Sequence, residues 1–329
     1  MKVSKAVAVS TILIFSISLS GMATDSDETG LKAKHSGSKI LGTPDFFVEV
    51  MDPSSTERYH RGVRFTPVAA VLRVVARENE YLLNPVEHDS CLDVAGLMAE
   101  FDPVSPLGFE EAKIGEGFVK VGVGVLRKNR EKYAPRPPYE VMELAETKTT
   151  WEKDSVKYKQ TCHGINGYGY ELKSEMKIEP QNHKLVIEWE LTNTGTRQLE
   201  TWHYSHNCFR FGNLDISDGY RLSFPYDFNI EGNSDAVEKT GRSLQFLKRP
   251  VTPLNIRVPF PDKDIPNTFE LIDEKTGLEA RCLTSRYGAY TTLHASKDYV
   301  CPEQFVRITL PPGQTAKWTR EYVFAGKTE

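Results

Sequence analysis

The sequence predicts an all-β protein, folded as one large antiparallel β-sandwich in a single domain. Two observations lead to this prediction: short segments with a side-chain period of two recur along the chain, and Gly, Pro and Asn separate them at regular intervals. No stretch shows a convincing amphipathic helical period, and no internal repeat or linker divides the body. At 329 residues the chain is long enough for one such domain.

The N-terminus has the pattern of a cleaved secretory signal. Lys2 and Lys5 precede an apolar run at 6–19, and small residues at 21–23 offer a cleavage site. Serines interrupt the apolar run, which is also short for a bilayer span, so a membrane anchor is disfavoured. We therefore expect residues 1–23 to be removed and the protein to be exported, either periplasmic or secreted, with no membrane partner afterwards.

The rest of the chain divides into a short polar segment and the sandwich. Residues 24–38 lack hydrophobic periodicity and are predicted to be disordered, and residues 39–329 are assigned to the β-sandwich domain. Loss of the signal lowers Lys plus Arg from 41 to 39 against 45 Asp plus Glu, so the formal net charge moves from −4 to −6. This balance lacks the basic footprint of nucleic-acid binding, and no nucleic-acid partner is expected.

The five cysteines are widely spaced, at positions 91, 162, 208, 282 and 301. They contain no CxxC pair, so no zinc site is predicted. In an exported protein they allow one or two disulfides with at least one thiol left over, and their pairing stays open. The chain also lacks GxSxG, and no GxGxxG precedes a helix, so no nucleotide or other cofactor is expected.

The densest group of polar and aromatic residues lies in the segment 184–211. Its first half alternates like a half-buried strand, an Asn-Thr-Gly turn follows, and a second strand begins after the turn. Along that second strand, His203 and Asn207 are predicted to point away from Tyr204 and His206. We interpret the segment as a β-hairpin whose two histidines point apart, which argues against a shared metal site.

Two residues are candidates for proton transfer. His206 titrates near neutral pH and shares a strand face with Tyr204. Glu303 stands between Pro302 and Gln304 at the start of a strand, and a carboxylate in an apolar setting can act as a base near neutrality. Each has a structural alternative: His206 as a hydrogen-bonded sheet residue, and Glu303 as an edge residue in solvent.

Three short motifs follow one another along the chain: YHRGVRF, LTNTGTRQLETWHYSHNCF and YVCPEQFVRITLPPGQT. Together they resemble the galactose mutarotase-like superfamily, which contains the aldose 1-epimerases. The second motif is similar to the family's strand that leads to His-x-Tyr-Phe, with His206 in place and Cys208 replacing the tyrosine. The third resembles the family's late strand with its glutamate, matched by Glu303. The first resembles the segment that places an arginine at the sugar site. This resemblance indicates Arg64 as the sugar-binding arginine, in preference to Arg61.

The resemblance implies a galactose mutarotase-like supersandwich that interconverts the anomers of a sugar by acid/base catalysis. Glu303 would take the proton of the anomeric hydroxyl while protonated His206 donates one to the ring oxygen, from opposite sides of the sugar. The ring then opens and closes again as the other anomer. The residues assigned to substrate binding are Arg64, Tyr204, Asn207, His203, Lys120 and Gln304.

The chain also departs from the family pattern. The early His-Gly-Gly segment is absent, with FVKVGVGVLRK in its place, and the central aspartate-histidine segment is not recognisable. The expected partner is therefore a mono- or oligosaccharide of open identity, and the oligomeric state stays open. Two alternatives remain: a non-catalytic carbohydrate-binding module, and a polysaccharide lyase-like enzyme that uses a tyrosine with a histidine.

Overall fold

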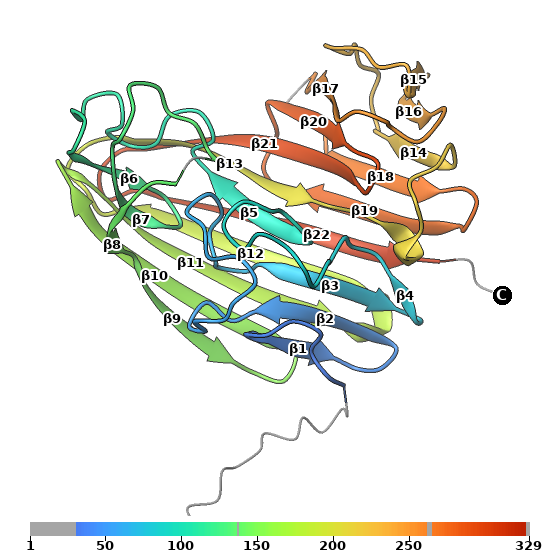
Figure 1. Ribbon diagram of the computed structural model, residues 1–329, viewed down its shortest axis with the longest axis horizontal. Coiled ribbons are helices and arrows are strands. Elements are labelled where there is room, and N and C mark those ends of the chain that lie inside the picture. The colour runs from blue at the N-terminus through green and yellow to red at the C-terminus, as the bar shows by residue number, and fades with distance from the viewer. Residues whose placement is uncertain (1–30, 137, 262–264, 327–329) are drawn as a thin grey trace, which may run out of the picture. The chain divides into compact units, whose positions relative to one another are not determined.

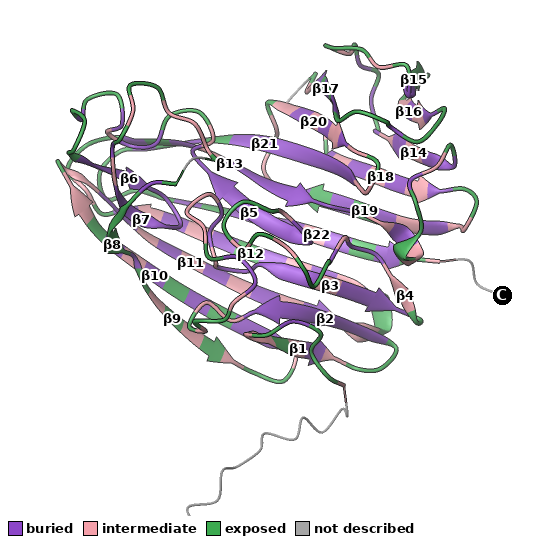
Figure 2. Ribbon diagram, in the orientation of Figure 1, coloured by how far each residue is buried: buried purple, intermediate pink, exposed green. Residues whose placement is uncertain are grey.

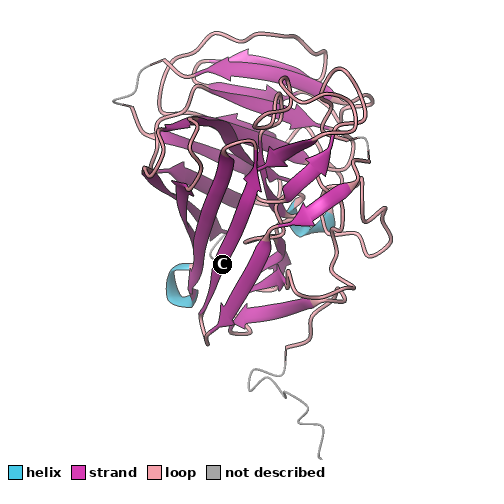
Figure 3. Ribbon diagram, turned by 90° about the vertical axis from the view of Figure 1, so that its left-hand side faces the viewer, coloured by secondary structure: helices cyan, strands magenta, loops and turns pink. Residues whose placement is uncertain are grey.

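A computed structural model of the chain describes residues 31–136, 138–261 and 265–326. These residues form two large antiparallel sheets and one small sheet, and their helical structure consists of two short 3-10 turns, η1 (Pro180–Asn182) and η2 (Phe211–Asn213). Figure 3 shows strands throughout this part of the chain. The prediction of a large all-β sandwich is confirmed. Among the described residues, no helix has the length and apolar character needed to cross a membrane.

One large sheet has nine strands, and it carries the candidate site (Figure 1). From edge to edge its order is β1 (Ser38–Gly42), β2 (Phe46–Met51), β3 (Val71–Ala76), β5 (Leu97–Phe101), β13 (Leu199–Asn207), β21 (Val300–Leu310), β20 (Tyr290–Ala295) and β17 (Leu254–Pro259), with β4 (Asn79–Glu80) paired to β3.

The other large sheet has ten strands. Its order is β15 (Val237–Thr240), β16 (Ser243–Phe246), β14 (Tyr220–Ser223), β18 (Asn267–Asp273), β19 (Leu278–Thr284), β22 (Thr315–Ala325), β12 (Lys184–Asn193), β11 (Tyr168–Glu179), β10 (Ser155–Ile165) and β9 (Glu146–Trp151). The small sheet consists of β6 (Gly117–Lys120), β7 (Gly124–Arg127) and β8 (Val141–Leu144).

The two large sheets pack face to face around one apolar core. The imidazole of His203 on β13 lies 5.2 Å from the Trp189 ring on β12 and 5.0 Å from the Trp318 ring on β22, measured between centroids. Near another edge of the core, Phe46 of β2 lies 6.2 Å from Phe324 of β22. Figure 2 shows the central strands as mostly buried, whereas β8 and β9 are largely exposed or intermediate. The main core therefore takes one face of each large sheet, and a second buried cluster that includes Met51, Leu72 and Met98 covers part of the outer face of the nine-stranded sheet.

The hairpin predicted for 184–211 is wrong, although both of its strands exist. β12 pairs with β11 and β22 in the ten-stranded sheet, whereas β13 pairs with β5 and β21 in the nine-stranded sheet. The chain crosses between the sheets after Asn193, whose Nδ2 donates to the carbonyl oxygens of Arg197 and Leu310 at 2.8 Å each. Turn residues bring a strand to an end, but strand partners are chosen by packing, which local sequence does not specify.

Ordered structure begins earlier than the sequence predicted. Residues 1–30, with the predicted signal, lie outside the described residues, but the segment assigned to disorder extends to residue 38. Within it, the backbone N–H groups of Lys34 and His35 donate to the Glu49 carboxylate at 3.0 and 2.7 Å. Glu49 is buried on β2, and a buried carboxylate needs such donors. The side chains of His35 and Ser38 also bind this carboxylate, at 3.0 and 2.6 Å, so polar residues of the segment pair with a buried charge.

Candidate functional site

The candidate site lies between β13 and β21, where the ladder that joins these strands is interrupted. The strands pair as far as residue 203 and meet again at residue 209 in the same register. This register sets His206 on β13 opposite Glu303 on β21. Figure 1 shows the two strands side by side in the middle of the sheet. Two residues far apart in the sequence are thus brought to one point.

Side chains fill the place of the missing ladder bonds. The backbone N–H of Asn207 donates to Cys301 Sγ at 3.2 Å, and its Nδ2 donates to the carbonyl oxygen of Pro302 at 2.6 Å. Pro302 has no N–H of its own, so a regular ladder could not continue through it. Asn207 also accepts a hydrogen bond from the Tyr322 hydroxyl at 2.9 Å, from the opposite sheet. Asn207 therefore stabilises the gap between β13 and β21 on the side that faces the interior of the sandwich.

His206 and Glu303 are in direct contact. Nδ1 of His206 lies 2.9 Å from Oε1 of Glu303, and their side chains are only 7% and 8% exposed. Cys301 Sγ lies 3.6 Å from the same carboxylate oxygen. Among the described residues, no hydrogen bond reaches the other oxygen, Glu303 Oε2. The expected arrangement, with the two groups on opposite sides of one sugar, is thus not the one the structure has, because facing positions on neighbouring strands place the side chains against each other.

A second carboxylate, that of Glu100 on β5, lies on the Nε2 side of the His206 imidazole, opposite Glu303. Its Oε2 accepts hydrogen bonds from Arg64 Nε at 2.8 Å and from the Tyr204 hydroxyl at 2.5 Å, and it lies 3.4 Å from His206 Nε2. Lys120 Nζ lies 3.7 Å from Oε1. Burial raises the pKa of Glu100, but the hydrogen bond from His206 and the charges of Lys120 and Arg64 outweigh burial and lower this pKa to about 2. Glu100 is therefore a buried anion.

The imidazole of His206 stands between two carboxylates. Burial lowers its pKa, but the charge of Glu303 and the contact with Glu100 oppose burial, and the pKa is held well above its ordinary value. Nε2 lies 3.0 Å from the Tyr204 hydroxyl, which donates in turn to Glu100. A protonated His206 at neutral pH is consistent with this series of hydrogen bonds from Nε2 through the Tyr204 hydroxyl to Glu100. Burial also raises the pKa of Tyr204 well above its usual value, which argues against a tyrosinate base of the lyase kind.

The structure brings together five of the eight residues selected from the sequence. Arg64, Tyr204 and Lys120 surround Glu100 next to the His206 and Glu303 pair. Lys120 is fully buried, and its Nζ donates to the carbonyl oxygen of Phe101 at 2.7 Å and to the Tyr133 hydroxyl at 2.9 Å. Of the two arginines considered, Arg64 is in the cluster, whereas Arg61 binds Ser90 Oγ at the surface.

The other three selected residues, His203, Asn207 and Gln304, face the interior between the sheets. His203 is 0% exposed and packs among tryptophans, and neither of its ring nitrogens has a hydrogen-bond partner among the described residues. Gln304 is also 0% exposed and donates to both oxygens of Asn267 at 2.8 Å. The predicted alternation along β13 is confirmed and places His203 and Asn207 out of reach of a sugar on the outer face, and the same alternation along β21 does so for Gln304.

Two residues at the site were not selected from the sequence. Glu100 is the only charge in LMAEF, and a lone carboxylate within an apolar strand was the signal that could have identified it. His294 on β20 binds Asn255 Oδ1 at 2.9 Å and the Tyr299 hydroxyl at 3.0 Å. The pairing of β20 with β21 sets His294 opposite Cys301, two positions from Glu303. Burial lowers the pKa of His294, and the charge of Glu303 opposes this shift. No local pattern marked His294.

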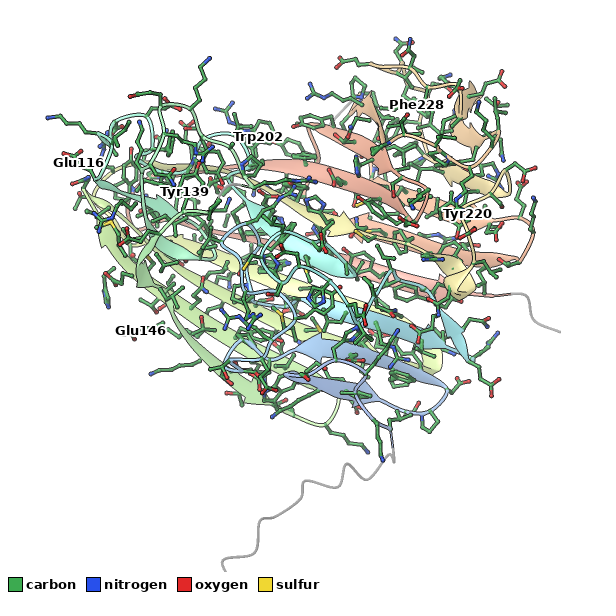
Figure 4. The ribbon with its side chains drawn as sticks, in the orientation of Figure 1. Glu116, Tyr139, Glu146, Trp202, Tyr220 and Phe228 are labelled. Atoms are coloured by element: carbon green, nitrogen blue, oxygen red, sulfur yellow. The ribbon has the colours of Figure 1, made fainter. Side chains whose placement is uncertain are left out.

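A partly exposed aromatic surface continues from the site across β21 and β20. The ring of Tyr204 stacks on Phe305 at 4.1 Å, Phe305 on Tyr290 at 4.6 Å, and Tyr290 lies 5.9 Å from Trp202, which is labelled in Figure 4. The guanidinium of Arg257 lies 4.2 Å from the Tyr290 ring. Trp202 and Tyr290 are half-buried and Arg257 is exposed, so the open side of the site is apolar with a cationic rim.

Comparison with known proteins supports the fold. No protein-family model and no curated protein sequence matches the chain. Among solved structures, a putative aldose 1-epimerase from Escherichia coli K12 matches with a TM-score of 0.58 at 13% identity, covering 88% of this chain and 99% of its own. A galactose mutarotase related enzyme from Lactobacillus acidophilus matches with a TM-score of 0.57 at 12% identity, covering 89% and 98%. An aldose epimerase homologue from C. elegans matches with a TM-score of 0.55 at 12% identity, covering 88% and 100%. The chain therefore has the galactose mutarotase-like β-sandwich fold, as its three motifs predicted.

Proposed function

We propose that this protein binds a sugar on the outer face of the nine-stranded sheet and interconverts its α and β anomers by acid/base catalysis. One observation carries the proposal: the carboxylate of Glu303, one oxygen of which receives no hydrogen bond from the described residues, lies 2.9 Å from the imidazole of His206. A base and an acid side by side at an aromatic surface are the groups this isomerisation requires. The predicted export signal would place the reaction in the periplasm or outside the cell.

In this reaction each group has a defined task. Oε2 of Glu303 accepts the proton of the anomeric hydroxyl, and His206 donates a proton to the ring oxygen. Nε2 of the protonated His206 faces the Tyr204 hydroxyl at 3.0 Å, so the proton that moves is the one on Nδ1. Because Nδ1 faces Glu303 Oε1 at 2.9 Å, the sugar must separate the pair as it binds. Contacts of catalytic groups often change in this way between the free and the bound enzyme.

The aromatic surface supplies a place for the body of the sugar. Tyr290 and Trp202 offer half-buried ring faces, and Arg257 beside them can donate to hydroxyl oxygens. Glu100 does not contact the sugar in this scheme, because it is 0% exposed. It keeps Arg64 and Tyr204 in position and balances the charge of the imidazolium.

Sugar binding without turnover is the second candidate function. It is favoured by the same contact, since His206 and Glu303 are less than a tenth exposed and leave no room for a ring between them in this conformation. A protein in which this contact stays closed would hold a sugar on the aromatic surface alone. The two candidate functions differ in one measurable event, the separation of the His206 and Glu303 side chains when the sugar binds.

Polarimetry and NMR of freshly dissolved α-glucose and α-galactose test the proposal. We expect the wild type to accelerate anomer equilibration, and His206→Ala and Glu303→Gln each to lower the rate by about 100-fold or more. His163→Ala and Glu188→Gln are matched controls, because both residues are exposed on the ten-stranded sheet, and they should retain the rate. Equal rates in the wild type and both site variants would overturn the catalytic proposal. NMR-detected sugar binding without acceleration would select the binding function.

A further inference from the structure

Three donor atoms of different chemistry meet in the gap between β13 and β21. His206, Cys301 and Glu303 each present one, and these atoms all lie within 4.8 Å of one another. His206 Nδ1 is 2.9 Å and Cys301 Sγ is 3.6 Å from the same Glu303 oxygen. All three residues are buried. We propose that His206, Cys301 and Glu303 form a binding site for a divalent transition metal ion, with Zn²⁺ as the ion that fits best.

The spacing of these atoms suits zinc. Zn²⁺ binds imidazole nitrogen, carboxylate oxygen and thiolate sulfur at roughly 2.0–2.3 Å, so ligands around a tetrahedral ion stand about 3.5 Å apart. The separation of Cys301 Sγ from Glu303 Oε1 already has this value, the His206 Nδ1 to Glu303 Oε1 distance of 2.9 Å is shorter, and all three donor atoms lie within 4.8 Å of one another, so small side-chain shifts can place them around one ion. Charge also fits, because a thiolate and a carboxylate balance the two positive charges of the ion in a buried place.

The residues behind the three ligands are placed as they are at known metal sites. A metal-binding histidine usually gives its second ring N–H to a carboxylate or another acceptor, which fixes the ring. Nε2 of His206 lies 3.0 Å from the Tyr204 hydroxyl and 3.4 Å from Glu100 Oε2, and Nδ1 is thereby directed into the gap. On the other side, the backbone N–H of Asn207 donates to Cys301 Sγ and orients the sulfur. Both supports exist before any ion binds.

Three protein ligands leave the fourth position of a tetrahedral ion open, as catalytic zinc sites do. The described residues donate no hydrogen bond to the second carboxylate oxygen, Glu303 Oε2. A metal ion would take the atoms that proton transfer needs, so we expect metal-bound protein to be inactive as a mutarotase. The metal site itself goes beyond the proposed function and does not depend on it. The spacing of the cysteines gave no hint of it, because the ligands come from two strands.

Cobalt substitution tests the site in the full chain. The protein is kept under a phosphine reductant, since Cys208 Sγ lies 3.9 Å from Cys301 Sγ and a disulfide would remove the ligand. We expect one equivalent of Co²⁺ to produce the intense visible bands of a tetrahedral site and a thiolate-to-cobalt charge-transfer band in the near ultraviolet, and Zn²⁺ to remove both. These spectra are independent of sugar turnover, so their failure is distinct from failure of the proposed function.

Variants decide whether the bands come from this site. Cys301→Ser should abolish the charge-transfer band, and Glu303→Gln should weaken Co²⁺ binding at least tenfold while it keeps the thiolate. If Cys301→Ser does not fold, Glu303→Gln still tests the site. Cys162→Ser, which changes a buried cysteine on β10, is the matched control and should retain the bands. No band for the wild type at a tenfold excess of Co²⁺, or a charge-transfer band that survives in Cys301→Ser, would overturn the proposal.

Discussion

Replacement of Glu100 by glutamine should destabilise the protein strongly at neutral pH. The substitution keeps the shape of the side chain but removes the charge that accepts from Arg64 and Tyr204 and faces Lys120. The fall of the Glu100 pKa from 4.5 to about 2 on folding corresponds to about 3 kcal/mol of stability above pH 4.5. Breaking one side of a buried ion pair costs a similar amount, about 3–5 kcal/mol.

The pH dependence of this effect has a definite sign. Because the folded-state pKa of Glu100 lies below the unfolded value, its stabilisation is fully present above about pH 4.5 and is lost as the pH falls towards 2. Urea unfolding of the wild type and Glu100→Gln should therefore give free energies that differ by about 3 kcal/mol at pH 7 and by roughly 1.4 kcal/mol at pH 3.

A surface glutamate provides the comparison for this experiment. Glu188 is exposed on β12 and pairs with Lys177 at 3.2 Å, so Glu188→Gln should change the free energy of unfolding by less than about 1 kcal/mol at either pH. If Glu100→Gln behaves like this control at pH 7, the buried charge network does not stabilise the fold, and its assignment as the support of His206 is wrong.

Two further substitutions test buried and strained positions. Burial raises the pKa of Asp102 to about 7, with Lys120 opposing, so the contribution of Asp102 to stability falls as the pH rises from 3.8 to 7. Asp102→Asn should therefore gain up to about 4 kcal/mol relative to the wild type over this range, and urea curves that keep a constant difference between the two proteins would refute this. Gly164 has a φ of +73°, and a Cβ there would lie 1.8 Å from the Tyr168 carbonyl oxygen, whereas Gly241, at +57°, has open space. Gly164→Ala should therefore cost clearly more unfolding free energy than the roughly 1 kcal/mol expected for Gly241→Ala, and equal losses would show that the backbone yields.

The candidate site shows where sequence reasoning succeeds and where it ends. His206 and Tyr204 could be assigned to one face because strand alternation is a local property of the backbone. Glu303 could be singled out from its own segment, but only the resemblance connected it to His206, since nothing in that segment points to β13. Glu100 was passed over although it is central, because its importance comes from the charges of Arg64 and Lys120, which other parts of the chain supply.

The same division holds for the whole protein. The sequence by itself determined the β-rich architecture, the alternation along β13 and the turn after Asn193, because each depends on neighbouring residues and on the pleat of a strand. Only the tertiary structure decided that β12 and β13 enter different sheets, that the ladder between β13 and β21 is interrupted, and that the resulting gap brings an imidazole, a thiol and a carboxylate together. Those features depend on packing between distant segments, where burial and charge pairing act across space and not along the chain.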